Sequence, residues 1–193
     1  MTNFLRHQLR PAVAILIAFT ILTGVAYPAV ITAIAQLVFP SQANGSLLIV
    51  NGNVVGSTLI GQAFSDPRYF WGRLSAAGAD GYDGMASAGS NLGPTNPDLI
   101  DRVTEDLAAL QAANGGGPVP VDLLTTSASG LDPDISPAGA EYQVARVAAA
   151  RGMTEDQVRA AIARHTEGPL LGFIGQTRVH VLELNLDLDG AFG

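Results

Sequence analysis

Serine, histidine and aspartate side chains give this sequence the residue types of a serine hydrolase. Nucleophilic catalysis needs a serine, a base and an orienting acid held in one constellation. The sequence has no G-x-S-x-G motif, which presents the nucleophile on a strand-to-helix turn in many hydrolases. The residue types are present, but their spacing does not predict a hydrolase. The candidates are Ser90, Ser127, Ser129, His165, His180, Asp132 and Asp134.

Two further groupings have the residue types of metal ligands. A metal ion could be held by a histidine pair with a nearby glutamate: His165, His180, Glu167 or Glu183. His165, however, falls at the C-terminal end of an expected helix, where the helix dipole stabilises a protonated imidazole. Asp132-Pro133-Asp134 could contact a hard cation, but aspartates beside proline are also ordinary turn formers. For both groupings we favour these structural roles over metal binding, and no metal ion is predicted.

The composition excludes several classes of chemistry. The 193 residues include no cysteine, and all ten basic residues are arginine. Thiol nucleophiles and thiolate metal sites are therefore absent, as are a Walker A loop and the aspartate–lysine–threonine motif of P-type ATPases. We expect that this polypeptide does not hydrolyse ATP by itself. A net charge of −7 without any basic run argues against nucleic acid as a partner.

Residues 11–39 form an uncharged, apolar stretch that is long enough to cross a bilayer as a helix. Arg6, His7 and Arg10 precede it, and the next basic residue is Arg68. The positive-inside rule therefore predicts a cytoplasmic N-terminus at residues 1–10 and an extracytoplasmic domain at residues 40–193. A cleaved signal peptide is the alternative, but its apolar region is usually shorter. The expected location is the plasma membrane of a bacterium.

Small or polar side chains interrupt this stretch. Thr20, Gly24 and Thr32 lie at i, i+4 and i+12, and we expect them to form a face that packs against another membrane helix. The rest of the helix would contact membrane lipid. Gly24 and Pro28 predict a kink, because proline removes a backbone donor and clashes with the preceding turn.

The remaining residues predict a soluble α+β domain. Asn51-Gly52 is the dipeptide most favoured in two-residue hairpin turns, and it joins expected strands at residues 46–50 and 53–60. Capping residues and apolar spacing predict helices at residues 97–114, 137–151 and 154–165. Alternation predicts strands at residues 119–124 and 180–189.

Two long polar segments, residues 72–97 and 125–136, are not explained by core packing. A loop of such length in a compact domain is usually functional or disordered. We expect both loops to dock on partner proteins through hydrogen-bonding side chains. The expected partner-binding residues are Arg73, Ser90, Asn91, Thr95, Asn96 and Asp132.

An ordered set of motifs over nearly the whole chain resembles the KdpC family, the C subunit of the Kdp potassium-transporting P-type ATPase. The chain departs from the family pattern at Leu74, which stands where proline is usual, and at Asp134, where histidine or asparagine is common. The motifs include Gln42-Ala43-Asn44-Gly45-Ser46-Leu47, Gly89-Ser90-Asn91-Leu92-Gly93-Pro94-Thr95-Asn96-Pro97, Ser127-Ala128-Ser129-Gly130-Leu131-Asp132-Pro133, Tyr142-Gln143 with Arg146-Val147-Ala148, and Val181-Leu182-Glu183-Leu184-Asn185-Leu186.

The resemblance implies an accessory subunit without catalysis of its own, in complex with a channel-like potassium-translocating subunit, a P-type ATPase subunit and a small membrane subunit. It implies support of assembly and a chaperone-like increase in nucleotide affinity, with Gln143 contacting ATP. From the residues alone, Gln143 would be a mid-helix glutamine that faces solvent or a partner outside the cell. A membrane-anchored extracytoplasmic enzyme or solute-binding domain is the alternative function.

Overall fold

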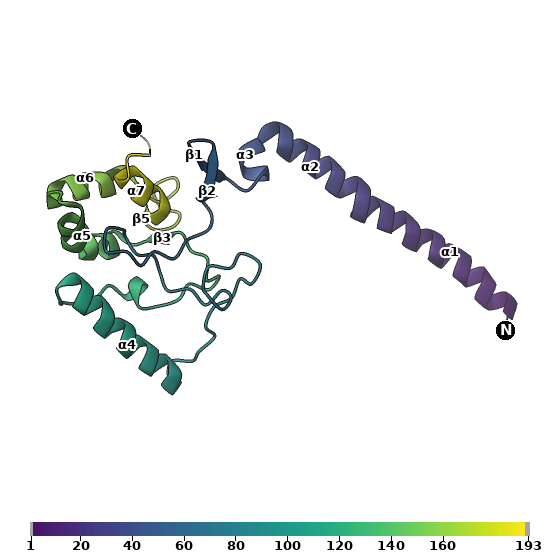
Figure 1. The fold of residues 1–193 in the computed structure, drawn as a ribbon. Coiled ribbons are helices and arrows are strands. Elements are labelled where there is room, and N and C mark those ends of the chain that lie inside the picture. Colours follow the sequence, from purple (N-terminus) through teal and green to yellow (C-terminus); the bar gives the residue numbers. More distant parts are fainter. Residues whose placement is uncertain (1, 192–193) are drawn as a thin grey trace. The chain divides into compact units, whose positions relative to one another are not determined.

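A computed structural model describes the backbone of residues 2–191, and the exposure of side chains from residue 7 onward. The chain divides between Leu47 and Leu48 into two compact units. The first unit consists of helices, and the second mixes helices with short strands (Figure 1). This is the predicted order of an apolar helix followed by an α+β domain.

The first unit is built on one continuous helical rod. It comprises α1 (Thr2–Ile21), the π-helical turn η1 (Leu22–Ala26) and α2 (Tyr27–Val38). An 18-residue window within residues 7–38 has a mean hydropathy of 2.2, and among the described residues this is the one helix that is long and apolar enough to cross a membrane. Its side chains are exposed almost throughout. The helix begins before the expected residue 11 and ends one residue before Phe39.

Where the sequence predicts a kink, at Gly24 and Pro28, the structure has the π-helical turn η1. Pro28 has no N–H, so the Gly24 carbonyl has no α-helical donor four residues later. The wider turn resolves this conflict, and the Tyr27 N–H bonds to the Leu22 carbonyl across it. The Thr23 hydroxyl donates to the Phe19 carbonyl at 2.7 Å. The helix therefore continues through the proline.

A short turn follows the rod. α3 (Pro40–Ala43) ends at Asn44, whose side-chain amide pairs with that of Gln36 through two hydrogen bonds of 3.1 and 3.3 Å. The Asn44 Nδ2 also donates to the Pro40 carbonyl at 2.6 Å. These bonds fold the chain back on the end of α2.

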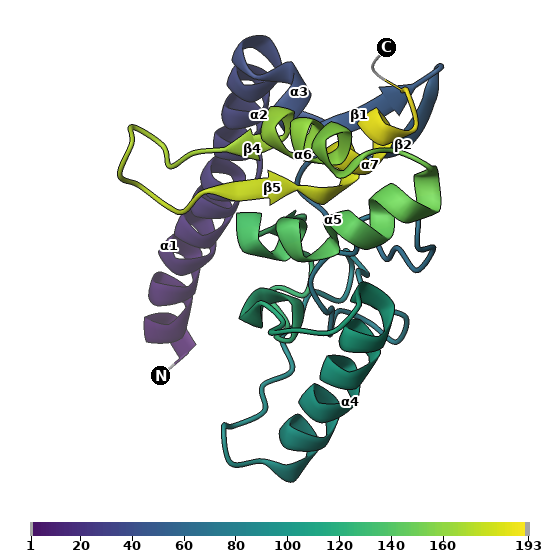
Figure 2. The same ribbon diagram turned by 90° about the vertical axis from the view of Figure 1, so that its left-hand side faces the viewer.

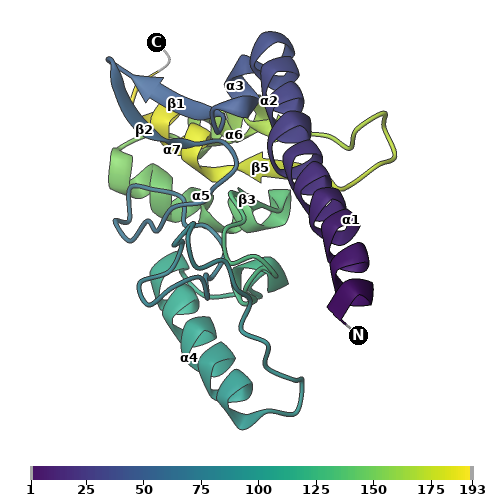
Figure 3. The same cartoon turned by 90° about the vertical axis from the view of Figure 1, so that its right-hand side faces the viewer.

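The second unit starts with the predicted hairpin, which the structure confirms. β1 (Leu47–Val50) and β2 (Asn53–Ser57) form a two-stranded sheet. Asn51 and Gly52 have φ values of 51° and 81°, as a type I′ turn requires. The second strand ends at Ser57, three residues earlier than expected. β2 lies beside the C-terminal helix α7 (Val181–Leu188) in Figure 3.

The three predicted helices are confirmed as α4 (Pro97–Asn114), α5 (Pro137–Arg151) and α6 (Glu155–Arg164). Their first turns are capped by the side chains of Asn96, Ser136 and Thr154, the last in a capping box with Gln157. α5 lies between α4 on one side and α6 and α7 on the other (Figures 1 and 2).

Both predicted strands outside the hairpin are wrong. Residues 119–124 contain a 3-10 turn, η2 (Val121–Leu123), because the Asp122 carboxylate is held by the backbone and hydroxyl of Ser136 at 2.7 and 3.0 Å. Residues 181–188 form the helix α7. Its buried side chains fall at i, i+1, i+3 and i+4, which is a helical face: Val181, Leu182, Leu184 and Asn185.

Three very short strands form the second sheet. β3 (Asp134–Ile135), β5 (Arg178–His180) and β4 (Thr166–Glu167) are antiparallel in the order β3-β5-β4. The sheet, α5, α6 and α7 share one core, which also takes in single residues from the loops. Its members include Phe70, Leu123, Ile135, Val144, Val147, Val158, Val179 and Leu184.

Candidate functional site

Two buried side-chain amides bind the backbone of the segment directly before residues 72–97, which we call the long loop. The Gln143 Oε1 accepts from the Trp71 N–H at 2.8 Å, and its Nε2 donates to the Trp71 carbonyl at 3.1 Å. Asn185 makes the same pair of bonds with Phe70, at 2.8 and 2.9 Å. Neighbouring residues of an extended chain point their polar groups in opposite directions. Gln143 from α5 and Asn185 from α7 therefore act as an amide clamp on opposite sides of one strand-like segment.

Two arginines of α5 complete this attachment. The Arg146 guanidinium donates to the carbonyls of Pro67 and Tyr69 and to the Gln143 Oε1, and it stacks 3.9 Å from the centre of the Trp71 ring. Burial lowers the pKa of Arg146 to about 10, so the group stays charged at neutral pH. Arg151 donates to the carbonyls of residues 68 and 188 and pairs with Asp189 at 2.9 Å.

Gln143 is fully buried, so the expectation that it faces solvent or a partner is wrong. Its amide also donates to the Gly139 carbonyl at 3.1 Å, and its oxygen accepts from both Trp71 and Arg146. An amide offers two donors and one acceptor oxygen with two lone pairs, and all are used. The geometry therefore does not fit a contact between Gln143 and ATP. Sequence reasoning missed Asn185, whose signal is a polar residue inside a run of leucines.

The two polar loops, residues 72–97 and 125–136, are bound to each other. The Arg73 guanidinium forms an ion pair of 3.0 Å with Asp132, and both side chains are about three-quarters buried. Arg73 also donates to the hydroxyl and carbonyl of Thr125. The Ser75 hydroxyl donates to the Gly130 carbonyl at 2.6 Å. Arg73 and Asp132, both predicted to bind partner proteins, thus bind each other within the chain.

The other predicted partner-binding residues differ in exposure. Ser90 is half-buried and accepts a hydrogen bond of 3.4 Å from Thr126 of the second loop. Asn96 uses its side chain to cap α4, bonding the Asp98 N–H at 2.8 Å. Asn91 and Thr95 are exposed on the surface. Within the predicted set, these two side chains are the exposed ones.

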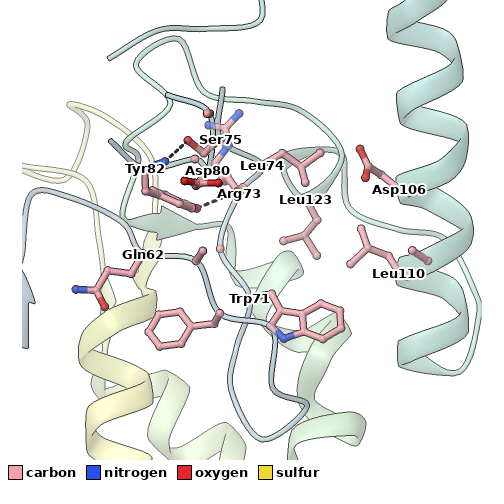
Figure 4. A pocket seen from close by; sticks show the side chains of 16 residues that line it. Gln62, Trp71, Arg73, Leu74, Ser75, Asp80, Tyr82, Asp106, Leu110 and Leu123 are labelled. Carbon is pink, nitrogen blue, oxygen red and sulfur yellow. Dashed lines mark hydrogen bonds between the residues drawn. The ribbon is translucent and has the colours of Figure 1, made fainter. Parts of the chain in front are cut away.

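A pocket of about 480 Å³ lies between the start of the long loop and α4 (Figure 4). Trp71, Leu110 and Leu123 line its apolar side, and Arg73, Asp80 and Tyr82 lie on the side of the long loop. The Tyr82 hydroxyl donates to the Arg73 carbonyl at 2.5 Å. The long loop therefore folds back on itself to make one wall of the pocket.

Two acidic groups at this pocket have raised pKa values. Burial, with a contribution from the charge of Asp132, raises the pKa of Tyr82 to about 12, so the phenol remains a hydrogen-bond donor. Burial also raises the pKa of Asp106, against the effect of Arg102, whose Nε lies 3.9 Å from the carboxylate. An apolar wall with a partly buried carboxylate suits a side chain or small molecule with an apolar body and a donor group.

The structure uses the candidate catalytic histidines in other ways. The His165 Nε2 lies 3.0 Å from the Asp187 carboxylate. The His180 Nε2 donates to the Thr58 carbonyl at 2.7 Å, and its Nδ1 caps α7. The Ser127 hydroxyl accepts from the Gly130 N–H at 2.9 Å. These residues therefore serve turns and helix ends.

The carboxylates that could have held a cation are also engaged. Asp132 bonds the Asp134 N–H at 3.1 Å in an aspartate turn and pairs with Arg73, while Asp134 pairs with Arg178 at 3.1 Å. In the part of the chain that the structure describes, no three histidine, aspartate or glutamate side chains lie together as a metal site would need. The turn-forming role of Asp132-Pro133-Asp134 is the one that the contacts support.

The π-turn decides which residues of the candidate span share a face. Twelve α-helical steps turn about 120° beyond complete turns, which would separate Thr20 from Thr32. The π-turn holds one extra residue and removes about 100° of rotation, so the two threonines lie about 20° apart. Gly24 lies inside the turn, and a Cβ added there meets no atom within 4 Å. The face is therefore open within this chain.

Comparison with known proteins agrees with these features. Residues 9–190 match the family described as "KdpC: K+-transporting ATPase, c chain". A potassium-transporting ATPase KdpC subunit of Sorangium cellulosum (strain So ce56) is 63% identical over 186 residues, covering 95% of this chain and 98% of that protein. KdpC subunits of Koribacter versatilis (strain Ellin345) and Polaromonas naphthalenivorans (strain CJ2) are 54% and 56% identical, covering 96% of this chain and 96% and 95% of those proteins. The chain therefore belongs to the KdpC family, and it is a membrane-associated subunit of a potassium-transporting ATPase.

Proposed function

We propose that this chain is a non-catalytic subunit that anchors in the plasma membrane and binds the other subunits of the potassium-transporting ATPase. The observation that carries the proposal is the full-length similarity to KdpC subunits. The order of one apolar helix and one α+β unit supports it. The partners are a channel-like potassium-translocating subunit, a P-type ATPase subunit and a small membrane subunit.

The domain acts as a brace, and the joined polar loops form its docking surface. Their internal ion pair and hydrogen bonds hold the backbone before a partner arrives, which lowers the entropy lost on binding. Asn91, Thr95 and the 98% exposed Met85 project from this framework. A brace of this kind raises ATPase activity by stabilising the assembled state.

ATP enters this proposal only through the ATPase subunit. Gln143 supports the docking surface, because its amide fixes the peptide of Trp71 directly before the long loop. An effect of the chain on nucleotide affinity is then transmitted through contact between subunits. Substitution of Gln143 would alter that effect by loosening the loop.

The proposed topology places residues 1–10 in the cytoplasm and the α+β domain outside, because the arginines near the helix precede it. Single cysteines at Ser65 and Met85, both exposed, should react with an impermeant maleimide on intact cells. A cysteine at Gln8 should react only after lysis. The reverse pattern would overturn the topology. Ser127 is an unsuitable site, because it is only 8% exposed.

Co-purification tests the function itself. The tagged full-length chain, extracted in mild detergent, should bring down the translocating and ATPase subunits. Asn91→Gly with Thr95→Ala should reduce the yield of the complex, whereas Glu155→Ala, on the exposed first turn of α6, should not. Glycine is used at residue 91 because its φ of 52° would strain alanine. Recovery of the chain without these subunits would favour the alternative, a membrane-anchored solute-binding domain that uses the 480 Å³ pocket.

A further inference from the structure

The loop between β4 and β5 exposes four large apolar side chains within five residues. Leu170, Leu171, Phe173 and Ile174 are 68%, 77%, 76% and 50% exposed. Residues 168–177 contain no charged side chain. Single exposed apolar residues are normal on protein surfaces, but a cluster of this kind marks a contact with a protein or a membrane. We call residues 168–177 the apolar tip.

Four backbone N–H groups of the apolar tip bond to carbonyls within it. Leu170 and Ile174 exchange two hydrogen bonds of 2.8 and 2.9 Å, N–H to carbonyl in each direction. The N–H groups of Gly172 and Phe173 bond to the carbonyls of Pro169 and Leu170, at 3.0 and 3.3 Å. A peptide group without a partner is costly in hydrocarbon. Three of the four exposed apolar residues, Leu170, Phe173 and Ile174, therefore already have a partner for the backbone N–H.

The base of the tip is held firmly. Glu167 pairs with Arg178 in the register of β4 and β5, and their side chains form an ion pair of 2.6 Å. Arg178 also pairs with Asp134 of β3 at 3.1 Å. Leu171 has a φ of 54°, a left-handed conformation that is uncommon for leucine. Figure 2 shows the loop projecting from the sheet, away from α5 and α6. The apolar side chains are thus presented on a rigid support.

The chain itself brings the tip close to a bilayer. Nine residues lie between Val38, at the end of the candidate span, and Leu48, at the start of the second unit. The ten steps from Val38 to Leu48 extend at most about 36 Å. The α+β domain is therefore always tethered near the membrane, and an apolar loop on it meets the lipid surface at a high effective concentration.

We propose that the apolar tip inserts Leu170, Leu171, Phe173 and Ile174 into the interfacial layer of the bilayer that the chain's own helix spans. Residues 40–193 carry eight arginines and 17 acids, a net charge of −9. Insertion thus depends on apolar burial, and attraction to anionic lipids does not drive it. The tip is a second membrane contact, which restricts rotation of the domain about its tether.

Depth-dependent quenching of a fluorophore tests this proposal. The full-length chain with Leu171→Cys, its only cysteine, is labelled with an environment-sensitive dye and placed in phosphatidylcholine nanodiscs without other subunits. We expect a blue-shifted emission that lipids with a shallow nitroxide quench several-fold more strongly than a water-soluble quencher does. The same dye at Met85→Cys, on another exposed loop, should show the opposite ratio.

A second substitution separates insertion from a general effect of the label. Adding Phe173→Asp should abolish the blue shift at residue 171, while Met85→Asp should leave it unchanged. Both sites are exposed, so neither change should alter the melting temperature. Emission at residue 171 that matches the water-exposed Met85 site would overturn the proposal. A blue shift that appears only with the other subunits present would also overturn it, because it would show a protein groove as the occupant.

Discussion

The side-chain amide of Gln143 binds both polar groups of the Trp71 backbone, at 2.8 and 3.1 Å, across 72 residues of sequence. These two hydrogen bonds replace the backbone hydrogen bonds that a neighbouring β-strand would supply. With Asn185 on the other side of the segment, it makes α5 and α7 the lateral support of an extended chain that has no sheet of its own.

The amide clamp should contribute strongly to stability. Gln143→Leu leaves the N–H and carbonyl of Trp71 buried without partners, at a cost of about 1–3 kcal/mol for each group. We expect a fall in the melting temperature of the purified chain without any nucleotide present. Asn185→Leu should act similarly through Phe70, and Gln42→Leu, on an exposed turn, should have little effect. A variant at Gln143 with unchanged stability but altered nucleotide affinity of the complex would show that the nucleotide role is direct.

Asp187 should link stability to pH. Burial acts to raise its pKa, but the hydrogen bonds from Arg164 and His165 outweigh burial and hold the pKa below the usual range. A lowered pKa adds stability above the ordinary aspartate value, and that stability is lost as pH falls through the folded-state pKa. Asp187→Asn should therefore destabilise the chain by about 1–2 kcal/mol at pH 7, with the difference shrinking toward pH 3. Thermal melts of both proteins across this range measure it, and a gap that widens at acid pH would contradict the prediction.

Variants of Arg73 and Asn91 should distinguish a side chain that holds the two loops together from one that contacts a partner. Arg73→Ala removes a largely buried partner of Asp132 and should lower both the melting temperature and the potassium-stimulated ATPase activity of the complex. Asn91→Gly should lower the activity alone, because Asn91 is exposed and glycine accepts its φ of 52° without strain. If Asn91→Gly leaves both assembly and activity unchanged, the exposed part of the long loop is not a docking surface.

Gly24 should be sensitive to size only in the assembled complex. A Cβ at this position meets nothing within 4 Å in this chain, so Gly24→Leu should insert normally and retain its helix. In the complex, the larger side chain should hold a neighbouring helix away and reduce co-purification. Gly24→Ala is the graded control and should have a smaller effect. Equal recovery of partners with glycine and leucine would assign this face to lipid.

Gly72 should be needed for the wall of the pocket. A Cβ there would lie 2.7 Å from the Tyr82 hydroxyl, which bonds the Arg73 carbonyl. Gly72→Ala should displace Tyr82 and destabilise the long loop, and limited proteolysis should cut residues 72–97 faster. In the double variant with Tyr82→Phe, part of this effect should be relieved. Identical cleavage of the wild-type and Gly72→Ala chains would show that the loop does not depend on this packing.

Local signals in the sequence determined the long apolar helix, the first hairpin and three helices of the domain. Asn51-Gly52 specifies its turn through backbone angles that few other residues adopt, and Asn96, Ser136 and Thr154 cap helices through bonds within a few residues. Such features depend on neighbours in the chain, so a single sequence predicts them. The uncharged length of residues 11–39 predicts a span for the same reason.

Only the tertiary structure decided α7, the second sheet and the buried polar contacts. The alternation of leucines in residues 180–189 predicts a strand, but α7 forms because Val181, Leu184 and Asn185 together meet the core and the Phe70 segment. The two- and three-residue strands of the second sheet are too short to carry a pattern. Residue type singles out Arg73 and Asp132 as hydrogen-bonding side chains, and the family resemblance singles out Gln143. Their burial depends on partners about 60 to 70 residues away, because the energy of a polar group is set by what surrounds it.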